Sequence, residues 1–243
     1  MGDVKFLHFY KWPCKAAGAA LKWIRSSRLT GMVTNRQRRG RIIIEDALLP
    51  VTIQVGKGAS FTLNGCLSFT SWNGLREKIY ISIGEGAALT IDGDFQIGPG
   101  CRLVVEAGGQ LYIGGRRKES ASGMTERTLV MVRRRVVIGV DLLCAWGVYI
   151  TDCDWHEISG QPSTEDTIIG DHVWLAPNCS VLKGSRIGKG CIVATRAVTR
   201  GATYADCSLL GGAPAKVLAE GREWTRDLAP LPKQMPEPPR VRD

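Results

Sequence analysis

The segment that ends at His156 is the part of the sequence in which reactive residue types are most concentrated. His156 is the last residue of the run Ile150-Thr-Asp-Cys-Asp-Trp-His, and it is one of only three histidines in the chain. Asp152 and Asp154 precede it by four and two residues, and alternate residues of an extended segment share one face. A carboxylate beside an imidazole can hold one tautomer and leave the other nitrogen basic. The pattern predicts a general base.

The other two histidines stand in less suggestive surroundings. His8 lies in an irregular N-terminal stretch, where a packing or surface role is the default. His172 falls beside a corner of the repeats described next, and we expect it on a solvated face.

A six-residue rhythm must position these groups. From Ile169 the chain reads IGDHVW, LAPNCS, VLKGSR, IGKGCI and VATRAV, with an aliphatic residue at each first position and a small or β-branched residue at each fifth. Six residues suffice for one short strand and a turn, and three such units close a triangular coil. Stacked coils satisfy their backbone groups with the coil above and below. The rhythm predicts an all-β solenoid, with the aliphatic side chains inside and the small ones at tight corners.

A second repeated fragment marks further corners upstream. The pattern aliphatic-Gly-x-Gly occurs at Val55–Gly58, Ile83–Gly86, Ile97–Gly100 and Ile187–Gly190. No copy opens a long helical pattern, which argues against a dinucleotide-binding loop and favours corners of the coil.

We expect three parts in the chain. Residues 1–45 form a basic N-terminal segment with a short amphipathic helix over Trp12–Ser27. Residues 46–204 form the β-helix, with excursions at about 115–131 and 157–168. Residues 205–243 hold a short helix over 217–228 and a Pro-rich tail. The N-terminal helix fits two roles that the sequence leaves open, a cap on the open end of the solenoid and peripheral contact of residues 1–30 with an anionic membrane.

Net charge and cysteine spacing limit the kind of partner and the cellular compartment that we expect. The formal net charge of +9 over 243 residues implies an anionic partner. The basic runs lack the interleaved aromatic side chains of a single-strand platform, so no nucleic acid is expected. Eight cysteines form no CxxC pair, which fits neither a zinc ribbon nor a disulfide-dense module. We expect a cytoplasmic protein, with peripheral association at the inner face of the membrane as an open alternative. We expect the corner cysteines Cys101, Cys179 and Cys191 to be inert thiols.

The region from about Ile138 to Leu218 resembles the hexapeptide-repeat O-acetyltransferases, the group of xenobiotic, maltose and galactoside acetyltransferases and of capsule and O-antigen acetylases. The pieces that match are Val136-Val-Ile-Gly, the run from Cys144 to His156, Ile169-Gly-Asp-His-Val-Trp-Leu, the five hexads, and Gly212-Ala-Pro-Ala-Lys. The resemblance implies a left-handed parallel β-helix that assembles as a homotrimer, with active sites in the clefts between neighbouring prisms.

The resemblance also implies a reaction. His156 matches the base that takes the proton from an acceptor hydroxyl of a saccharide as it attacks the thioester of acetyl-CoA, without a metal. Asp152 or Asp154 would bind acceptor hydroxyls or orient the imidazole, and Trp146 and Trp155 would line the acceptor site. The contacts to acetyl-CoA carry over to six positions, namely Trp174, Pro177, Thr195, Thr199, Arg200 and Lys216.

Three other functions remain open on the sequence. An N-acetyltransferase acting on an amino-sugar nucleotide would use the same fold. A zinc enzyme of the γ-carbonic anhydrase kind needs three converging histidines, and the positions of His8, His156 and His172 argue against it. A non-catalytic scaffold of envelope biosynthesis would not require the intact Asp-x-Asp-Trp-His segment or the Gly-x-Pro-Ala-Lys ending.

Overall fold

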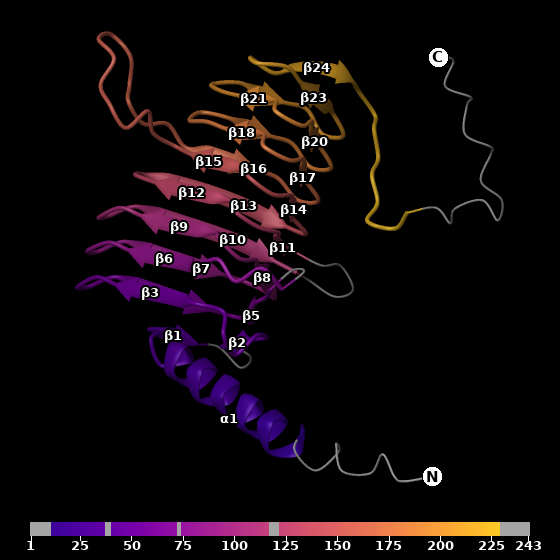
Figure 1. The fold of residues 1–243 in the computed structure, drawn as a ribbon. Helices are drawn as coiled ribbons and strands as arrows, with labels where there is room; N and C mark the ends of the chain where they lie inside the picture. The colour runs from indigo at the N-terminus through magenta and orange to yellow at the C-terminus, as the bar shows by residue number, and fades with distance from the viewer. Residues whose placement is uncertain (1–10, 37–39, 72–73, 117–121, 229–243) are drawn as a thin grey trace, which may run out of the picture.

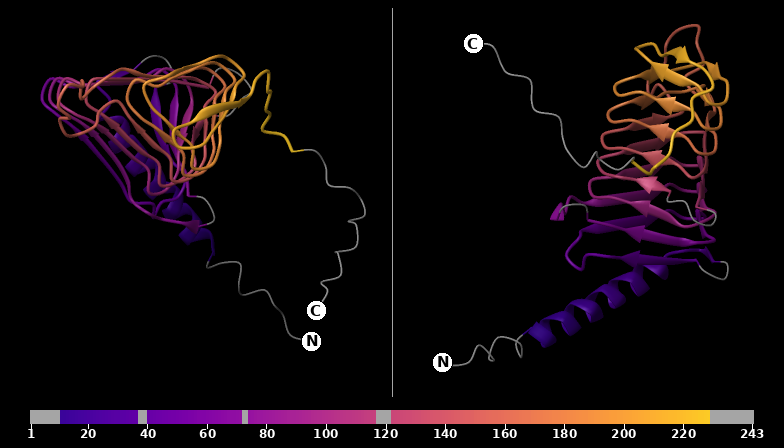
Figure 2. Two further views of the ribbon diagram at one scale, coloured as in Figure 1. Left: turned by 90° about the horizontal axis from the view of Figure 1, so that it is seen from above. Right: turned by 90° about the vertical axis from the view of Figure 1, so that its right-hand side faces the viewer.

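The computed structural model describes residues 11–36, 40–71, 74–116 and 122–228, and it shows a three-sided prism of stacked coils (Figure 1). From β1 to β23, successive strands pass to three different faces, so each sheet collects every third strand of the chain. Viewed along the axis, the coils superpose as a triangle (Figure 2). This confirms the predicted solenoid of hexapeptide repeats, a left-handed parallel β-helix.

Three parallel sheets, which we call A, B and C, form the faces of the prism. Sheet A contains β1 (Asn35–Arg36), β4 (Ser60–Leu63), β7 (Ala88–Ile91), β10 (Gln110–Gly115), β13 (Arg135–Val140), β16 (Thr167–Ile169), β19 (Arg186–Ile187) and β22 (Thr203–Tyr204). Sheet B contains β2 (Arg41–Ile44), β5 (Cys66–Phe69), β8 (Phe95–Ile97), β11 (Gly123–Met124), β14 (Leu143–Cys144), β17 (Trp174–Leu175), β20 (Ile192–Val193), β23 (Leu209–Gly211) and β24 (Lys216–Ala219). Sheet C contains β3 (Val51–Val55), β6 (Ile79–Ile83), β9 (Arg102–Val105), β12 (Leu129–Val132), β15 (Tyr149–Thr151), β18 (Ser180–Val181) and β21 (Val198–Thr199).

The hexad positions occupy the places that the rhythm predicts. The first positions are all buried in the prism, at Ile169, Leu175, Val181, Ile187 and Val193. The fifth positions are fully buried at the corners, at Val173, Cys179, Ser185, Cys191 and Ala197. The fourth positions turn the chain with a positive φ even where they are not glycine, with φ near 54° at His172 and 59° at Asn178. The aliphatic-Gly-x-Gly fragments likewise end on a residue of positive φ, so they are corners as predicted.

The coils shrink toward the C-terminus, which explains why strict hexads are seen only there. Ser60 pairs with Ala88 in the next coil, whereas Ile168 pairs with Arg186, a much closer neighbour along the chain. Only the shorter of these two turns equals three hexads, so the wider N-terminal coils keep the alternation of buried and exposed residues without the six-residue period. The coil also extends beyond the predicted 46–204, because it begins with β1 and β2 and runs on to β23.

The corner thiols are buried as expected. Burial raises the pKa of Cys101 to about 11 and that of Cys179 to about 12, and it raises the pKa of Cys191 as well. Since the thiolate is the reactive form, these three cysteines act as small apolar side chains at ordinary pH.

The predicted excursion at 115–131 is mostly wrong. Residues 117–121 lie outside the described residues, but Gly123–Met124 and Leu129–Val132 are β11 and β12 of the coil. The polar character of this stretch is misleading because alternate residues still point inward, where Met124 and Val130 are buried. Thr128, fully buried among them, donates its hydroxyl to the carbonyl of Ala145 at 3.3 Å.

The predicted C-terminal helix is also wrong. Lys216–Ala219 instead forms β24, which pairs antiparallel with β23 after a turn at Gly212 and Pro214. Residues 220–228 then leave the sheet and run back along the prism without helix or strand (Figure 1). The free edge of β23 accounts for the difference, because an edge strand binds a neighbouring segment through its backbone. We call residues 220–228 the C-terminal strap.

The C-terminal strap is fixed at the corner between sheets A and B. The ring of Trp224 stacks on His172 at 4.2 Å between centroids, and its indole N–H donates to the His172 carbonyl at 2.9 Å. His172 Nδ1 lies 2.6 Å from Asp141 Oδ2, and Arg226 donates to the other oxygen of that carboxylate at 2.8 Å. The expectation of a solvated His172 is met only in part, because its side chain is 37% exposed but Trp224 covers one face of the ring and both ring nitrogens have partners.

The opposite end of the prism is closed by α1 (Lys11–Thr30), which confirms the predicted N-terminal helix and its capping role (Figure 1). β2 is the first strand of sheet B, so its outer backbone groups have no strand beside them. Ser26 and Thr30 of α1 supply hydroxyl acceptors for the N–H groups of Ile44 and Ile42, at 3.0 and 2.9 Å. Among the described residues, no helix combines the length and the apolar character needed to cross a bilayer.

The strap predicts a pH-dependent stability. Burial alone would raise the pKa of Asp141, but hydrogen bonds from Arg226 and His172 outweigh it, and the pKa lies below its ordinary value of 3.8. A depressed pKa means that this stabilisation is complete above the ordinary value and is lost as the pH falls through the folded one. We expect Asp141→Asn to lower the free energy of unfolding by about 1–2 kcal/mol at pH 5, with a smaller difference at about pH 2.5.

Denaturant melts of the two proteins at both pH values measure this difference. Glu223→Gln changes an exposed acid of the same strap and is the matched control, expected to behave as the wild type at both pH values. An Asp141→Asn penalty that does not shrink on acidification would contradict the assigned role of the carboxylate.

Candidate functional site

The chain leaves the prism between β15 and β16 as a hairpin that carries His156 (Figure 1). Cys153 and Thr164 form an antiparallel bridge at its base, and the Asp154 N–H donates to the Ser163 carbonyl at 2.9 Å. We call residues 153–164 the His156 loop. The predicted excursion at 157–168 is therefore present, but it begins earlier and ends before Thr167 enters β16.

His156 lies on the outgoing arm of this loop with its side chain exposed. Among the described residues, the structure records no hydrogen bond or ion pair of its imidazole. The preceding residue fixes the arm, because Trp155 has φ near 62° and its indole N–H donates to the Tyr149 hydroxyl at 3.0 Å. The imidazole is thus carried on an anchored backbone and faces the solvent, where it can accept a proton from a bound molecule.

Asp152 does not have the role expected of it. It is fully buried, and its carboxylate accepts hydrogen bonds from the backbone N–H groups of Arg133 and Arg134, each at 2.8 Å, and of Arg135. A carboxylate with both oxygens engaged by the backbone holds a corner of the coil and has no free face for acceptor hydroxyls. The sequence pattern does not predict this contact between Asp152 and the backbone, because the corner that Asp152 binds belongs to the previous coil of the chain.

Asp154 faces the site but is engaged by two cations. Lys183 Nζ lies 2.7 Å from its carboxylate and Arg200 Nη2 lies 3.1 Å from it. Lys183 is only 3% exposed, and its ammonium also donates to the Pro162 carbonyl on the returning arm of the loop. Among the described residues, the structure records no hydrogen bond between the His156 ring and either carboxylate, so the expected orientation of the ring by Asp152 or Asp154 is not found in the single chain.

Lys183 therefore ties both arms of the His156 loop to the next coil. Nothing in the sequence pattern signals this role, since Lys183 occupies an ordinary hexad position and its partners Asp154 and Pro162 lie on a loop outside the repeat. A buried ammonium is tolerated only when it is paired, and here Asp154 supplies the compensating charge.

Three of the positions expected to line the site stand on a different edge of the prism from His156. Trp146, Pro177 and Thr195 occupy equivalent places in three successive coils, on the edge between sheets B and C. Backbone hydrogen bonds record the stacking, from Asn178 N to the Trp146 carbonyl at 3.0 Å and from Arg196 N to the Pro177 carbonyl at 3.2 Å. Trp146 is 51% exposed, so this edge offers an apolar surface to a ligand.

His156 belongs to the edge between sheets C and A, so the width of sheet C separates it from those three positions. Along one coil, Pro177 stands before β18 and Lys183 stands after it, so this strand of sheet C lies between the two edges. Arg200 stands on the His156 edge, where its side chain is 44% exposed beside Asp154. A single chain therefore brings together only the loop and its two cations.

The remaining predicted positions have mixed outcomes. Thr199 is fully buried and its hydroxyl accepts from Ser185 at 3.0 Å inside the prism, so its side chain is not accessible to a ligand in the single chain. Trp174 points outward from sheet B, with its ring 6.0 Å from that of Trp224 of the C-terminal strap. Lys216 opens β24 and is exposed.

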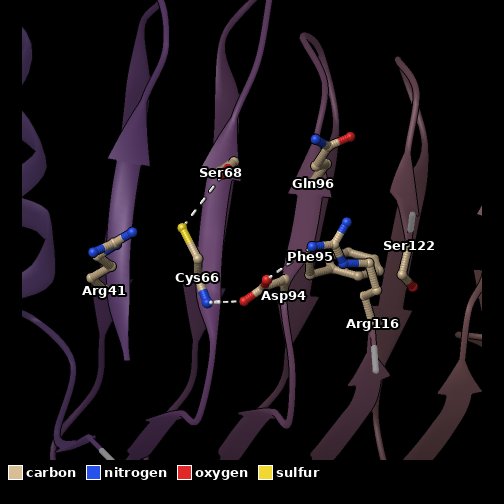
Figure 3. A pocket seen from close by; sticks show the side chains of 8 residues that line it. All are labelled: Arg41, Cys66, Ser68, Asp94, Phe95, Gln96, Arg116 and Ser122. Carbon is tan, nitrogen blue, oxygen red and sulfur yellow. Dashed lines mark hydrogen bonds and ion pairs between the residues drawn. The ribbon is translucent and has the colours of Figure 1, made fainter. Parts of the chain in front are cut away.

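A separate hollow lies on the outer face of sheet B in the N-terminal coils (Figure 3). Its volume is about 260 Å³, and the ion pair of Arg116 with Asp94, at 3.6 Å, crosses it. Asp94 also accepts the Cys66 N–H at 2.8 Å. None of the residues predicted for the site lines this hollow. Within the described residues, no three His, Cys, Asp or Glu side chains gather as a metal site requires.

Comparison with known proteins places the repeats in a recognised class. Residues 166–201 match the family model described as "Bacterial transferase hexapeptide (six repeats)". The chain is 38% identical over 90 residues to "Probable acetyltransferase Rv3034c" of Mycobacterium tuberculosis, covering 34% of this chain and 30% of that protein. It is 31% identical over 105 residues to "Putative lipopolysaccharide biosynthesis O-acetyl transferase WbbJ" of Escherichia coli, covering 37% and 53%.

The chain therefore spans about a third to a half of the curated relatives it matches. Among solved structures, a polysialic acid O-acetyltransferase, OatWY, aligns over 80% of this chain and 92% of its own, with 21% identity and a TM-score of 0.46. The sequence matches confirm the resemblance to hexapeptide-repeat transferases. The family model covers the coils that directly follow the His156 loop.

Lys183→Met tests the anchoring of the His156 loop. Losing the ammonium leaves Asp154 and the Pro162 carbonyl short of a partner, at a cost of more than about 1.4 kcal/mol, which is tenfold in an opening equilibrium. We expect amide hydrogen exchange in residues 153–164 to become at least about tenfold faster. Lys189→Met, an exposed lysine of the next corner, is the matched control. Unchanged exchange in the loop of Lys183→Met would refute the anchoring role.

Proposed function

We propose that this protein transfers the acetyl group of acetyl-CoA to a hydroxyl of a saccharide, with His156 as the general base. The observation that carries the proposal is the exposed, unengaged imidazole on an arm whose neighbours Asp152, Asp154 and Trp155 are all fixed by other contacts. The names of the matched relatives, an acetyltransferase and an O-acetyl transferase of lipopolysaccharide biosynthesis, support the reaction and the acceptor class.

The proposed chemistry is a direct transfer. The imidazole of His156 accepts the proton of the acceptor hydroxyl while the oxygen attacks the thioester carbonyl. The C–S bond then breaks, and the imidazolium returns the proton to the departing sulfur, so the products are the acetyl ester and free CoA. No residue of the chain is acylated, and the protein's part is to hold the two substrates and the base in line.

We further propose that the site is completed by a second copy of the chain in a homotrimer. Trp146, Pro177 and Thr195 lie on one edge of the prism and His156 lies on another, so one chain cannot present both sets to one thioester. A closed cyclic trimer sets an edge of one prism against a different edge of the next, and it repeats this contact three times. This arrangement would place acetyl-CoA between neighbouring prisms.

Exposed cations support the binding of the CoA phosphates. Arg200 keeps nearly half of its side chain exposed while it holds Asp154, and Lys216 is exposed on β24. Guanidinium and ammonium groups are the usual partners of phosphate oxygens. Thr199 is left out of this proposed set, because its hydroxyl lies inside the prism.

Replacing the base tests the proposal. We expect His156→Ala to lower turnover by at least about a hundredfold, since general-base catalysis typically contributes 10² to 10⁴ in rate. The affinity for CoA should change by less than about twofold, because the imidazole acts on the acceptor and not on the phosphates. The measurements are release of the CoA thiol with a panel of saccharides, and calorimetry with CoA.

Glu157→Gln, an exposed neighbour on the same loop, is the matched control and should keep wild-type turnover. A His156→Ala variant that retains most of its activity would mean that another group is the base. Acetylation of amino sugars at nitrogen, with no transfer to hydroxyls, would mean that the acceptor is an amino group and not a hydroxyl. Failure of the wild type to bind CoA would favour a scaffold.

A further inference from the structure

The outward face of α1 is apolar and uncovered in the structure. Outside the side that caps the prism, α1 carries exposed apolar side chains at Ala17, Ala20, Leu21, Trp23 and Ile24. Three are large, and they are 41% (Leu21), 71% (Trp23) and 55% (Ile24) exposed. Each member of this face has another one a helical turn away, so together they form one stripe along the helix.

Capping the prism does not require this stripe. The cap is made by the other side of α1, where Ser26 and Thr30 bind the edge of β2 and Leu29 packs against the core. Arg25 adds to it, because its guanidinium donates to the carbonyls of Ala47 and, at 2.7 Å, Leu49. The outward stripe makes none of these contacts. An exposed Trp and an exposed Ile on a helix that is already fixed by its other side suggest a binding surface.

A neighbouring loop enlarges the apolar surface. Leu48 is 63% exposed, and it lines a shallow hollow of about 500 Å³ together with Ala17 and Leu21 of α1. The stripe on α1 and the Leu48 loop therefore form one surface at the N-terminal end of the prism.

Cations border this surface. A groove of about 650 Å³ runs between α1 and β2, and its lining includes Trp23 and the basic residues Lys22, Arg36 and Arg41. Arg28 of α1 is exposed as well. The described residues of the Leu48 loop and α1 include two acids, Glu45 and Asp46. Asp46 forms an ion pair with Arg76 at 2.7 Å, and Glu45 is exposed. Positive charge thus predominates around the apolar stripe.

We propose that this end of the molecule, the outward stripe of α1 with Leu48 and the basic groove beside it, docks on the surface of an anionic lipid bilayer. An amphipathic helix that carries Trp and Ile on one face and lysine and arginine beside it lies in the plane of the interface, with the apolar face in the acyl boundary. The basic side chains then meet the lipid phosphates, each adding about 1 kcal/mol of attraction near the surface.

The docking geometry keeps the His156 loop free. α1 lies at one end of the prism, and the loop leaves between β15 and β16 in the upper coils (Figures 1 and 2). From β3 to β15, sheet C rises by four strand spacings, which is about 19 Å. Docking depends only on the N-terminal end of the molecule and is independent of the proposed reaction.

Vesicle flotation of the full chain tests the docking. We expect the protein to float with vesicles of phosphatidylcholine containing about a third phosphatidylglycerol, and to bind at least about tenfold more weakly to phosphatidylcholine alone or in about 0.5 M NaCl. The double variant Trp23→Ser/Ile24→Ser should bind the anionic vesicles at least about tenfold more weakly, because it removes the two most exposed side chains of the stripe.

Ile158→Ser is the matched control, since it removes a 46% exposed isoleucine on the His156 loop and should leave binding unchanged. The melting temperature of each variant shows that the fold is intact. Equal flotation of the double variant and the wild type, or no flotation of the wild type with anionic vesicles, would overturn the proposal. A double variant that changes the oligomeric state while the wild type ignores vesicles would assign the stripe to a contact between copies of the chain. Loss of CoA binding, by contrast, would count against the proposed reaction and leave the docking untouched.

Discussion

The backbone hydrogen bonds between successive coils are the constraint on which the rest of this structure depends. Inside sheets A, B and C, each strand pairs in register with the strand one coil earlier and the strand one coil later, as Tyr149 does with Leu129 and Ser180. Parallel in-register pairing forces residues at equivalent places of each coil to stack in columns. The inner columns become a continuous apolar core, and the corner columns become three long edges on which polar groups from distant parts of the sequence meet.

The three edges of the prism carry different residues and segments. Between sheets A and B, the stack is covered by the C-terminal strap, whose Trp224 and Arg226 bind His172 and Asp141. Between B and C, the coils from β14 to β21 stack Trp146, Pro177 and Thr195 in one column. Between C and A, the chain departs as the His156 loop, and the next coils hold it with Lys183 and Arg200. A functional site built on such a prism must therefore combine a loop from one edge with a surface from another.

Much of this arrangement could be predicted from the sequence, and what could not be has a common physical cause. The hexads predict the columns. An aliphatic residue at the first position of each hexad and a small residue at the fifth indicate which side chains face inward. The same pattern places His156 where a coil gives way to a loop. What a repeat does not encode is a contact between different columns or with a segment outside the repeat. Asp152, Lys183 and Trp224 all act in that way, on partners in another coil, in the loop or across the end of the repeat.

The departures from expectation come from the same source. The resemblance assigns Thr199 to acetyl-CoA, but its side chain faces the core, where its hydroxyl accepts a hydrogen bond from Ser185. The segment at 217–228 has the composition of a helix, but the free edge of β23 binds its first residues as a strand. In this second case, tertiary hydrogen bonding overrides local propensity.

In the proposed trimer, the His156 edge of one copy works with the edge between sheets B and C of another. Co-assembly of two inactive variants measures this directly, one with His156→Ala and the other with Thr195→Trp, which obstructs the second edge. Shared sites predict that mixed oligomers recover roughly a quarter of wild-type turnover, because random mixing leaves that share of sites with both edges intact. Mixed oligomers that stay as inactive as either parent would show that each chain holds a complete site of its own.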